Sequence, residues 1–104
     1  MSSQVLVLYP RTPTSTFNKD YYLSTHMDLV KSVWGKYGLK SYSVVETSPE
    51  SGSPYAFITV MDYESKEAFG EAVKDERTKE VMADVEKFTN VKPEVVTGGV
   101  VARG

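Results

Sequence analysis

Two short segments of this 104-residue chain are apolar on both faces, and this limits the available folds more than any other feature. Residues 5–9 read Val-Leu-Val-Leu-Tyr, and residues 55–61 read Tyr-Ala-Phe-Ile-Thr-Val-Met. Successive side chains of a β-strand alternate between its faces, so both segments predict strands with apolar residues on each side. An antiparallel sheet with one solvated face would alternate apolar with polar residues. We therefore expect both faces of the sheet to be covered.

Hydrophobic spacing predicts two helical regions between the strands. The first runs from about residue 17 to 34, with Thr14 or Ser15 as a candidate cap, and ends at Gly35 and Gly38. Ser65 is a candidate N-cap for the second. The charged residues 75–77 interrupt the second region, and their mixed signs are typical of a solvated turn.

Two further strands complete the pattern. A segment over residues 42–47 is separated from the strand at 55–61 by a polar loop, which predicts an antiparallel hairpin. A valine-rich strand over residues 91–101 closes the chain. The order β-α-β-β-α-β predicts a single α+β domain over residues 1–104. Its expected fold is ferredoxin-like, with both helical regions on one face of a four-stranded antiparallel sheet.

The helices can cover only one face of this sheet, so the other face needs a second cover. Exposed apolar patches of this kind usually mark an interface. We predict a homodimer packed sheet to sheet. The alternative is a monomer whose loops and C-terminal tail fold over the sheet.

Composition removes several classes of function. The net charge is −2 and no basic cluster is present, so nucleic acid is not an expected partner. The apolar runs are far shorter than the roughly 20 residues of a membrane span, so no membrane partner is expected. The chain has no Cys, which removes disulfides and thiolate chemistry and suits the cytoplasm, the predicted location.

His26 is the single histidine and the first candidate for chemistry. One histidine cannot build a multi-histidine zinc site, and we expect no metal and no cofactor. His26 shares a helical stripe with Tyr22, so burial should keep the ring neutral and able to accept a proton. The alternative is a structural histidine bound to backbone. Asp20 and Asp28 flank the segment at spacings that do not favour contact with His26, so its partner stays open.

Aromatic residues supply candidate pocket walls. The chain has seven Tyr against four Phe, and buried phenols need partners that a polar-lined pocket would provide. Tyr22 lies one helical turn from His26 and could hold a substrate oxygen. Trp34 and Tyr42 are predicted to sandwich a flat ring, and Tyr9 and Phe17 to complete the substrate-binding walls. Core packing is the alternative for each of them.

In their order along the chain these residues resemble the EthD family of dimeric α/β-barrel proteins. The resemblance rests on short segments spread over nearly the whole sequence: Val7-Leu8-Tyr9-Pro10, Phe17, Tyr21-Tyr22, His26, Leu29-Val30, Ser65, Phe69, Met82-Ala83-Asp84 and Phe88-Thr89. The segment from Trp34 to Leu39 looks most like fungal members. The resemblance implies a ferredoxin-like fold that dimerises through its sheets, a cavity between helices and sheet, and a pocket-lining His26. At the position of Asp28, many relatives carry Pro. The aspartate of this chain would put a charge near the pocket mouth.

The residues favour a cofactor-independent enzyme acting on a small aromatic substrate, and the resemblance to fungal members, some of which look like polyketide-tailoring enzymes, implies a polyketide-like one. His26 would move a proton as base and then acid, in a dehydration, decarboxylation, isomerisation or cyclisation, with Tyr22 polarising an oxygen. A non-catalytic alternative is a small-molecule-binding, accessory or stress protein. A weaker alternative is a cofactor-free monooxygenase.

Overall fold

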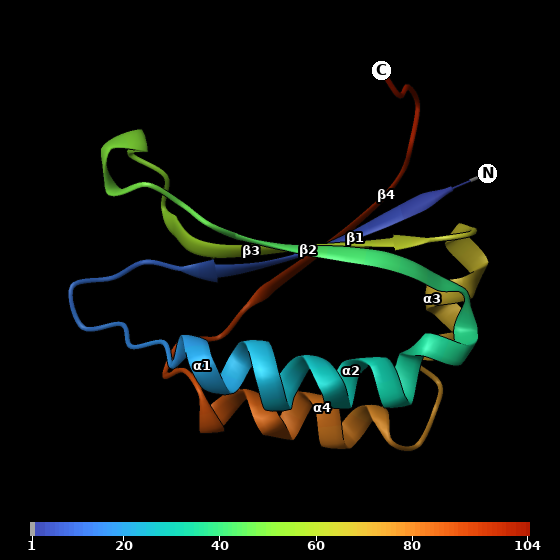
Figure 1. The fold of residues 1–104 in the computed structure, drawn as a ribbon, viewed down its shortest axis with the longest axis horizontal. Helices are drawn as coiled ribbons and strands as arrows, with labels where there is room; N and C mark the ends of the chain where they lie inside the picture. Colours follow the sequence, from blue (N-terminus) through green and yellow to red (C-terminus); the bar gives the residue numbers. More distant parts are fainter. Residues whose placement is uncertain (1) are drawn as a thin grey trace.

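The computed structural model describes residues 2–104, which form one four-stranded antiparallel sheet beside a layer of helices (Figure 1). The strands are β1 (Ser3–Pro10), β2 (Leu39–Glu46), β3 (Tyr55–Tyr63) and β4 (Glu94–Gly99). They lie in the order β2-β3-β1-β4, so the two apolar strands recognised in the sequence occupy the centre. The predicted hairpin pairs β2 with β3. The α+β, ferredoxin-like order of elements is confirmed.

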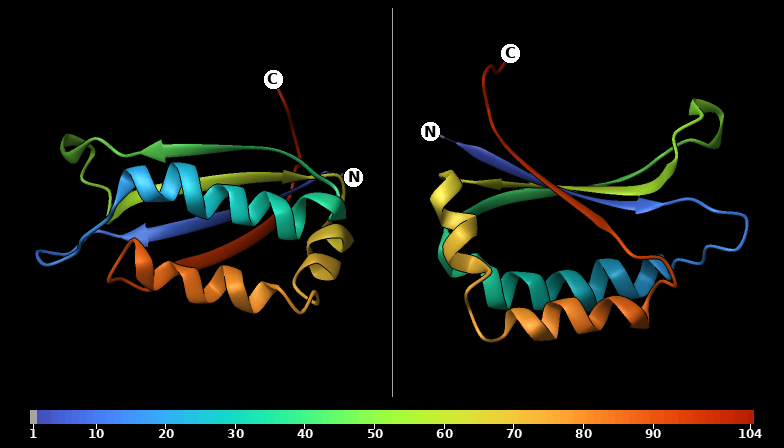
Figure 2. Two further views of the ribbon diagram at one scale, coloured as in Figure 1. Left: turned by 60° about the horizontal axis from the view of Figure 1, so that its bottom comes forward. Right: turned by 180° about the vertical axis from the view of Figure 1, so that it is seen from behind.

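The α-helices all lie on one face of the sheet (Figure 2), and a short 3-10 helix (Pro49–Ser51) lies in the β2–β3 hairpin. The first helical region contains α1 (Lys19–Tyr21), a π-helical turn (Tyr22–His26) and α2 (Met27–Trp34). The second contains α3 (Lys66–Ala72) and α4 (Thr78–Asp84). The predicted break at residues 75–77 separates α3 from α4, and α4 packs beside α2.

The sequence predicted the N-cap of the second helical region correctly, but not that of the first. Ser65 caps α3 as expected, because its hydroxyl accepts a hydrogen bond from the Ala68 backbone N–H. The expected cap at Thr14 or Ser15 is wrong. Asn18 begins the helix instead, and its side chain accepts from the Tyr21 backbone N–H. The residues before Asn18 are held in a loop, where the Ser15 hydroxyl bonds Thr12.

Side chains on β1 and β3 alternate as the sequence predicts. Val5 and Tyr9 on β1, and Phe57 and Met61 on β3, are buried against the helices. The register places Tyr9 opposite Phe57 and Val5 opposite Met61, so these side chains form the centre of one continuous core.

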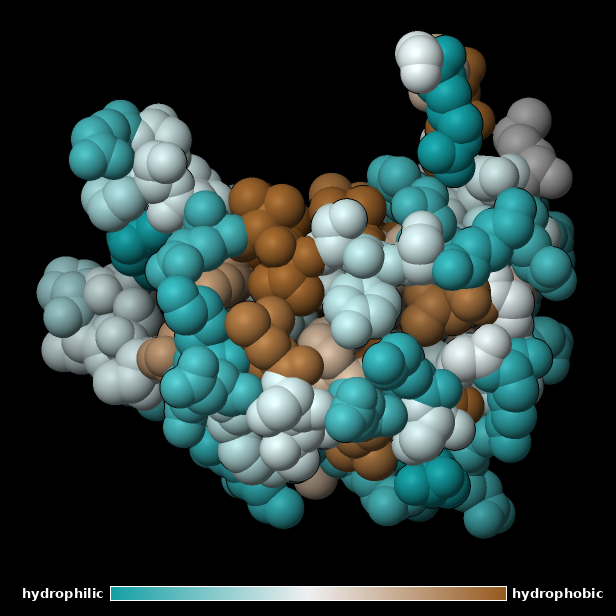
Figure 3. Space-filling view, in the orientation of Figure 1, coloured by the Kyte–Doolittle hydropathy of each residue, from teal (hydrophilic) through white to brown (hydrophobic). Residues whose placement is uncertain are grey.

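The opposite face of the sheet, here called the outer face, is also apolar. Leu6 pairs with Val60 on one side and Val96 on the other, and Leu8 pairs with Ile58. Figure 3 shows hydrophobic side chains gathered in a hollow on this side, between the β2–β3 hairpin and the C-terminal segment. The C-terminal segment rises beside one end of this face (Figure 1), where Arg103 pairs with Asp62 at 3.3 Å. Of the residues described, no helix is both long and apolar enough to cross a membrane.

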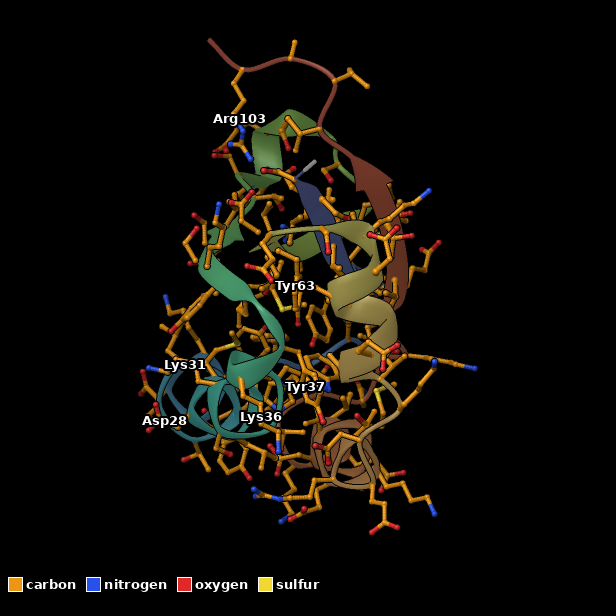
Figure 4. The ribbon with its side chains drawn as sticks, turned by 90° about the vertical axis from the view of Figure 1, so that its right-hand side faces the viewer. Asp28, Lys31, Lys36, Tyr37, Tyr63 and Arg103 are labelled. Carbon is orange, nitrogen blue, oxygen red and sulfur yellow. The ribbon has the colours of Figure 1, made fainter. Side chains whose placement is uncertain are left out.

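The end of α2 is fixed by a close approach at Gly38. Gly38 has φ 90°, and a Cβ atom placed there would lie 2.8 Å from Cγ of Glu64. In Figure 4, Tyr63 lies in the interior between α3 and this end of α2. Its ring packs edge-on against Phe69, and its hydroxyl is buried without a hydrogen-bond partner among residues 2–104.

Candidate active site

The candidate site is a cavity of about 210 Å³ between the sheet and the helices. Its walls come from β1, the first helical region, β3, α3, α4 and β4. The lining is mostly valine, methionine and aromatic side chains. Five side chains with a hydroxyl or imidazole group interrupt it: Tyr9, Tyr22, His26, Thr59 and Thr78. A few convergent polar groups in an apolar pocket are typical of a small-molecule site.

His26 lines this cavity and is 4% exposed. Its Nδ1 lies 2.9 Å from Oδ2 of Asp84, on the neighbouring helix α4. An ionised carboxylate can only accept hydrogen bonds, so Nδ1 carries the proton and donates to Asp84. The ring lines the cavity and Nδ1 is engaged, so Nε2 is the nitrogen open to a ligand. This is the orientation that a general base requires.

Asp84 is buried but has three partners. Its Oδ1 accepts a hydrogen bond of 2.7 Å from the Tyr21 hydroxyl, and Lys87 Nζ lies 3.7 Å from the same atom. Burial raises the pKa of Asp84, but the hydrogen bonds from Tyr21 and His26 outweigh it, so that the pKa is lowered from its usual value. Asp84 is therefore held ionised beside the imidazole.

Burial also controls the charge of His26. Desolvation lowers the pKa of the imidazole below its ordinary value, although the hydrogen bond to Asp84 opposes the shift. The ring is packed between Tyr22, stacked at 5.3 Å, and Phe88 at 4.6 Å between ring centroids. These aromatic neighbours exclude water and favour the neutral ring, which can accept a proton at Nε2.

Tyr22, Tyr9 and Thr59 bring hydroxyl groups to the same cavity. The Tyr22 hydroxyl is hydrogen-bonded to Oγ1 of Thr59 on β3. Burial raises the pKa of both Tyr9 and Tyr22, so the two phenols stay protonated. Protonated phenols can donate hydrogen bonds to an oxygen of a bound molecule, the task predicted for Tyr22.

Trp34 lines the far part of the cavity. Its Nε1–H donates a 3.0 Å hydrogen bond to the Thr78 hydroxyl, which in turn donates to the backbone carbonyl of Ala72. This chain of bonds fixes the indole against the start of α4. Trp34 thus lines the cavity, and Tyr42 does not.

Phe17 and Tyr42 are not among the residues that line the cavity. Phe17 stacks on Phe57 with centroids 3.9 Å apart and contacts Tyr22 from behind. Tyr42 faces the helix layer from β2, an edge strand, opposite Met61. The structure therefore brings together His26, Tyr22, Tyr9 and Trp34, and leaves Phe17 and Tyr42 outside this group.

Asp84 and Thr59 belong to the candidate site but were not predicted from the sequence. Asp84 lies between Val81 and Phe88, both buried, so a carboxylate on the apolar stripe of the second helical region was an available signal. Thr59 carried no comparable signal, because threonine is common in strands.

Asp28 does not lie at the mouth of the cavity, contrary to expectation. Its side chain is 75% exposed and pairs with Lys31 at 3.6 Å, and both point outward from α2 in Figure 4. Within residues 2–104, no cluster of three or more histidine or carboxylate side chains is arranged to hold a metal ion.

The chain is similar to known proteins both in sequence and in fold. Residues 12–92 match the family model of the EthD domain. No curated protein sequence is significantly similar to the chain. The structure of an EthD-like protein from Ralstonia eutropha is similar, with 26% identity, 99% and 95% of the two chains covered, and a TM-score of 0.84.

Two more distant structures share the fold. A dimeric ferredoxin-like protein of unknown function from Jannaschia sp. CCS1 has 15% identity, coverage of 96% of this chain and 100% of that one, and a TM-score of 0.67. SnoaB, a cofactor-independent oxygenase from Streptomyces nogalater, has 8% identity, coverage of 98% and 94%, and a TM-score of 0.67.

Proposed function

The chain belongs to the EthD family, and we propose that it is a cofactor-independent acid/base enzyme for a small aromatic or polyketide-like substrate. The observation that carries the proposal is the buried pair of His26 and Asp84, with Nε2 of His26 left for a ligand in an apolar cavity. A positioned base contributes on the order of 10²–10⁴-fold to a proton transfer.

In the proposed mechanism, Nε2 of His26 removes a proton from a carbon or oxygen of the substrate. Asp84 stabilises the imidazolium that forms, because its carboxylate already accepts the Nδ1 proton. The hydroxyl of Tyr22 donates a hydrogen bond to the substrate oxygen on which negative charge develops. His26 then returns the proton to another atom of the substrate or to the leaving group. Dehydration, decarboxylation, isomerisation and cyclisation all fit this sequence.

A direct test uses solvent deuterium exchange into the methyl group of acetophenone, a neutral one-ring ketone. Exchange needs only a base near the carbon and a donor near the carbonyl, so it reads the proposed chemistry without the natural substrate. We expect the protein to accelerate exchange, followed by NMR in D₂O, and His26→Phe to lose the acceleration while it keeps an aromatic ring in the core. Equal exchange by the wild type and His26→Phe would contradict the role of His26.

The second candidate is a non-catalytic binding protein, which the same cavity would also serve. It predicts that a small ligand binds equally well to the wild type and His26→Phe, with no exchange by either. The third is cofactor-free oxygenation, supported by the shared fold with SnoaB. It predicts that turnover of an electron-rich phenol consumes oxygen and stops under nitrogen.

We also propose a homodimer joined through the outer faces of the two sheets, in the cytoplasm. The support is the apolar outer face around Leu6, Val60 and Ile58 and the fold shared with a dimeric ferredoxin-like protein. The cysteine-free sequence suits a reducing compartment.

A further inference from the structure

The cavity beside His26 is adjacent to a second hollow on the surface, here called the outer groove. The outer groove has a volume of about 580 Å³ and lies along the end of α4 and residues 89–93. Met82, Val85 and Pro93 line both the cavity and the outer groove. These three side chains therefore form the wall between the two spaces.

Met82 is the movable part of this wall. Its side chain is half exposed, at 52%, although it lines the cavity. Methionine is unbranched and has three rotatable bonds, whereas valine is stiff at its branched carbon and proline is fixed in a ring. Of the three wall residues, Met82 can therefore change its conformation most easily.

The size of the cavity limits what fits behind this wall. An apolar cavity of roughly 150 Å³ holds one benzene molecule. At about 210 Å³, the cavity beside His26 has room for one six-membered ring with small substituents. A fused two-ring compound exceeds this volume, and on the side of the outer groove it would have to displace Met82.

The lining also limits the charge of the ligand. Its described residues include no Lys, Arg, Asp or Glu, and the carboxylate of Asp84 is hydrogen-bonded to His26, one of the lining residues. Burial favours the neutral form of His26, so the ring offers no fixed positive charge. An anion would lose its hydration and meet a buried carboxylate, which disfavours its entry.

We propose that the part of the substrate bound beside His26 is a single uncharged ring, and that Met82 sets this size limit. This inference rests on the proposed function. Larger substrates are accepted only when the side chain at position 82 opens the cavity to the outer groove.

The test uses the indole N–H of Trp34, the chain's single Trp, as a reporter of occupancy. The Trp34 ring lines the cavity and its N–H donates to Thr78. A bound ligand should therefore shift the single indole N–H resonance in the NMR spectrum. The wild type and Met82→Ala are titrated with 4-methylphenol, with 2-naphthol and with benzoate at neutral pH. Lys79→Ala is the matched control, because it also shortens a long exposed side chain on α4 but does not line the cavity.

We expect 4-methylphenol to shift the Trp34 resonance saturably in all three proteins, and benzoate to bind at least tenfold more weakly. We expect 2-naphthol to bind at least tenfold more tightly to Met82→Ala than to the wild type or Lys79→Ala. The proposal is overturned if 2-naphthol and 4-methylphenol bind the wild type alike, if Met82→Ala changes nothing, or if neither phenol binds. It is also overturned if benzoate matches 4-methylphenol.

The outcome of this binding test does not depend on whether the proposed function is correct. Binding read at Trp34 requires no turnover, so the size limit can hold even if deuterium exchange does not depend on His26. Conversely, exchange that depends on His26, together with unrestricted binding of 2-naphthol, would overturn the size limit alone.

Discussion

At the scale of single residues, the candidate site depends on a histidine whose two nitrogens have different tasks. Nδ1 is bound to Asp84 and Nε2 is left for the ligand. Asp84 in turn is held by the Tyr21 hydroxyl, a residue outside the cavity lining. The position and charge of one base thus depend on side chains that never touch the ligand.

The first prediction concerns this dependence. Asp84→Asn offers an amide that can donate to Nδ1, which would move the ring proton to Nε2 and remove the base. We expect the accelerated deuterium exchange to fall by about 10²–10⁴-fold. In the wild type, exchange should be pH-independent near neutrality and fall as the pH drops through the lowered pKa of His26, below 6.5, because protonation removes the acceptor. An Asp84→Asn variant with wild-type exchange would contradict the assignment.

A second residue-scale prediction concerns Tyr63. Its hydroxyl is fully buried and has no partner among residues 2–104, so it is desolvated without compensation. We expect Tyr63→Phe to raise the free energy of unfolding by about 1 kcal/mol, measured by urea denaturation. The matched control is Tyr22→Phe, which removes a buried hydroxyl bonded to Thr59 and should lower the free energy of unfolding by about 1 kcal/mol. A loss of stability in Tyr63→Phe would show that the hydroxyl is satisfied.

At the scale of elements, the first helical region is not a regular helix. Residues Tyr22–His26 form a π-helical turn, in which the N–H of Met27 bonds the carbonyl of Tyr22. Such turns occur frequently at functional sites. Here the wider turn stacks the Tyr22 ring on His26, while Tyr21 reaches Asp84 on the neighbouring helix.

The element-scale prediction concerns the end of α2, where two glycines differ in conformation. Gly38 is left-handed, and a Cβ atom there would meet Glu64, whereas Gly35 is helical with open space around it. We expect Gly38→Ala to lower the free energy of unfolding by about 1–2 kcal/mol. Gly35→Ala should leave it unchanged or raise it by about 0.5 kcal/mol. Chemical denaturation of the two variants side by side provides the measurement, and equal losses in both would contradict the prediction.

At the scale of the whole molecule, the sheet separates two apolar spaces. The helices cover one face and line the cavity, while the outer face is left with an apolar hollow (Figure 3). Leu6 lies on this face on the central strand β1, between Val60 and Val96. Burying such a surface in a dimer would remove it from water.

Leu6→Glu tests this arrangement. A carboxylate at the centre of an apolar interface would have to lose its hydration, so we expect the dimer to dissociate into folded monomers. Sedimentation velocity measures the assembly, and circular dichroism checks the fold. Leu23→Glu is the control, since Leu23 is 48% exposed on the opposite, helical side and should leave a dimer intact. A wild-type protein that sediments as a monomer, or a dimeric Leu6→Glu variant, would contradict the sheet-to-sheet interface.

The sequence by itself determined the features that depend on local periodicity. Alternation in the segments 5–9 and 55–61 predicted two strands with two apolar faces, and the Ser65 cap and the break at 75–77 were located correctly. These features follow from the two-residue and 3.6-residue repeats of strands and helices, which are fixed by backbone geometry and need no tertiary context.

Only the tertiary structure decided which residues distant in the sequence are in contact. Asp84 lies 58 positions from His26 along the chain, and the two meet because α4 packs beside α2 with a particular rotation about its axis. The same packing leaves Phe17 and Tyr42 outside the cavity, and the π-helical turn changes which side chains share a face. Helix rotation and strand position depend on the sum of many long-range contacts, so no single local pattern in the sequence specifies them.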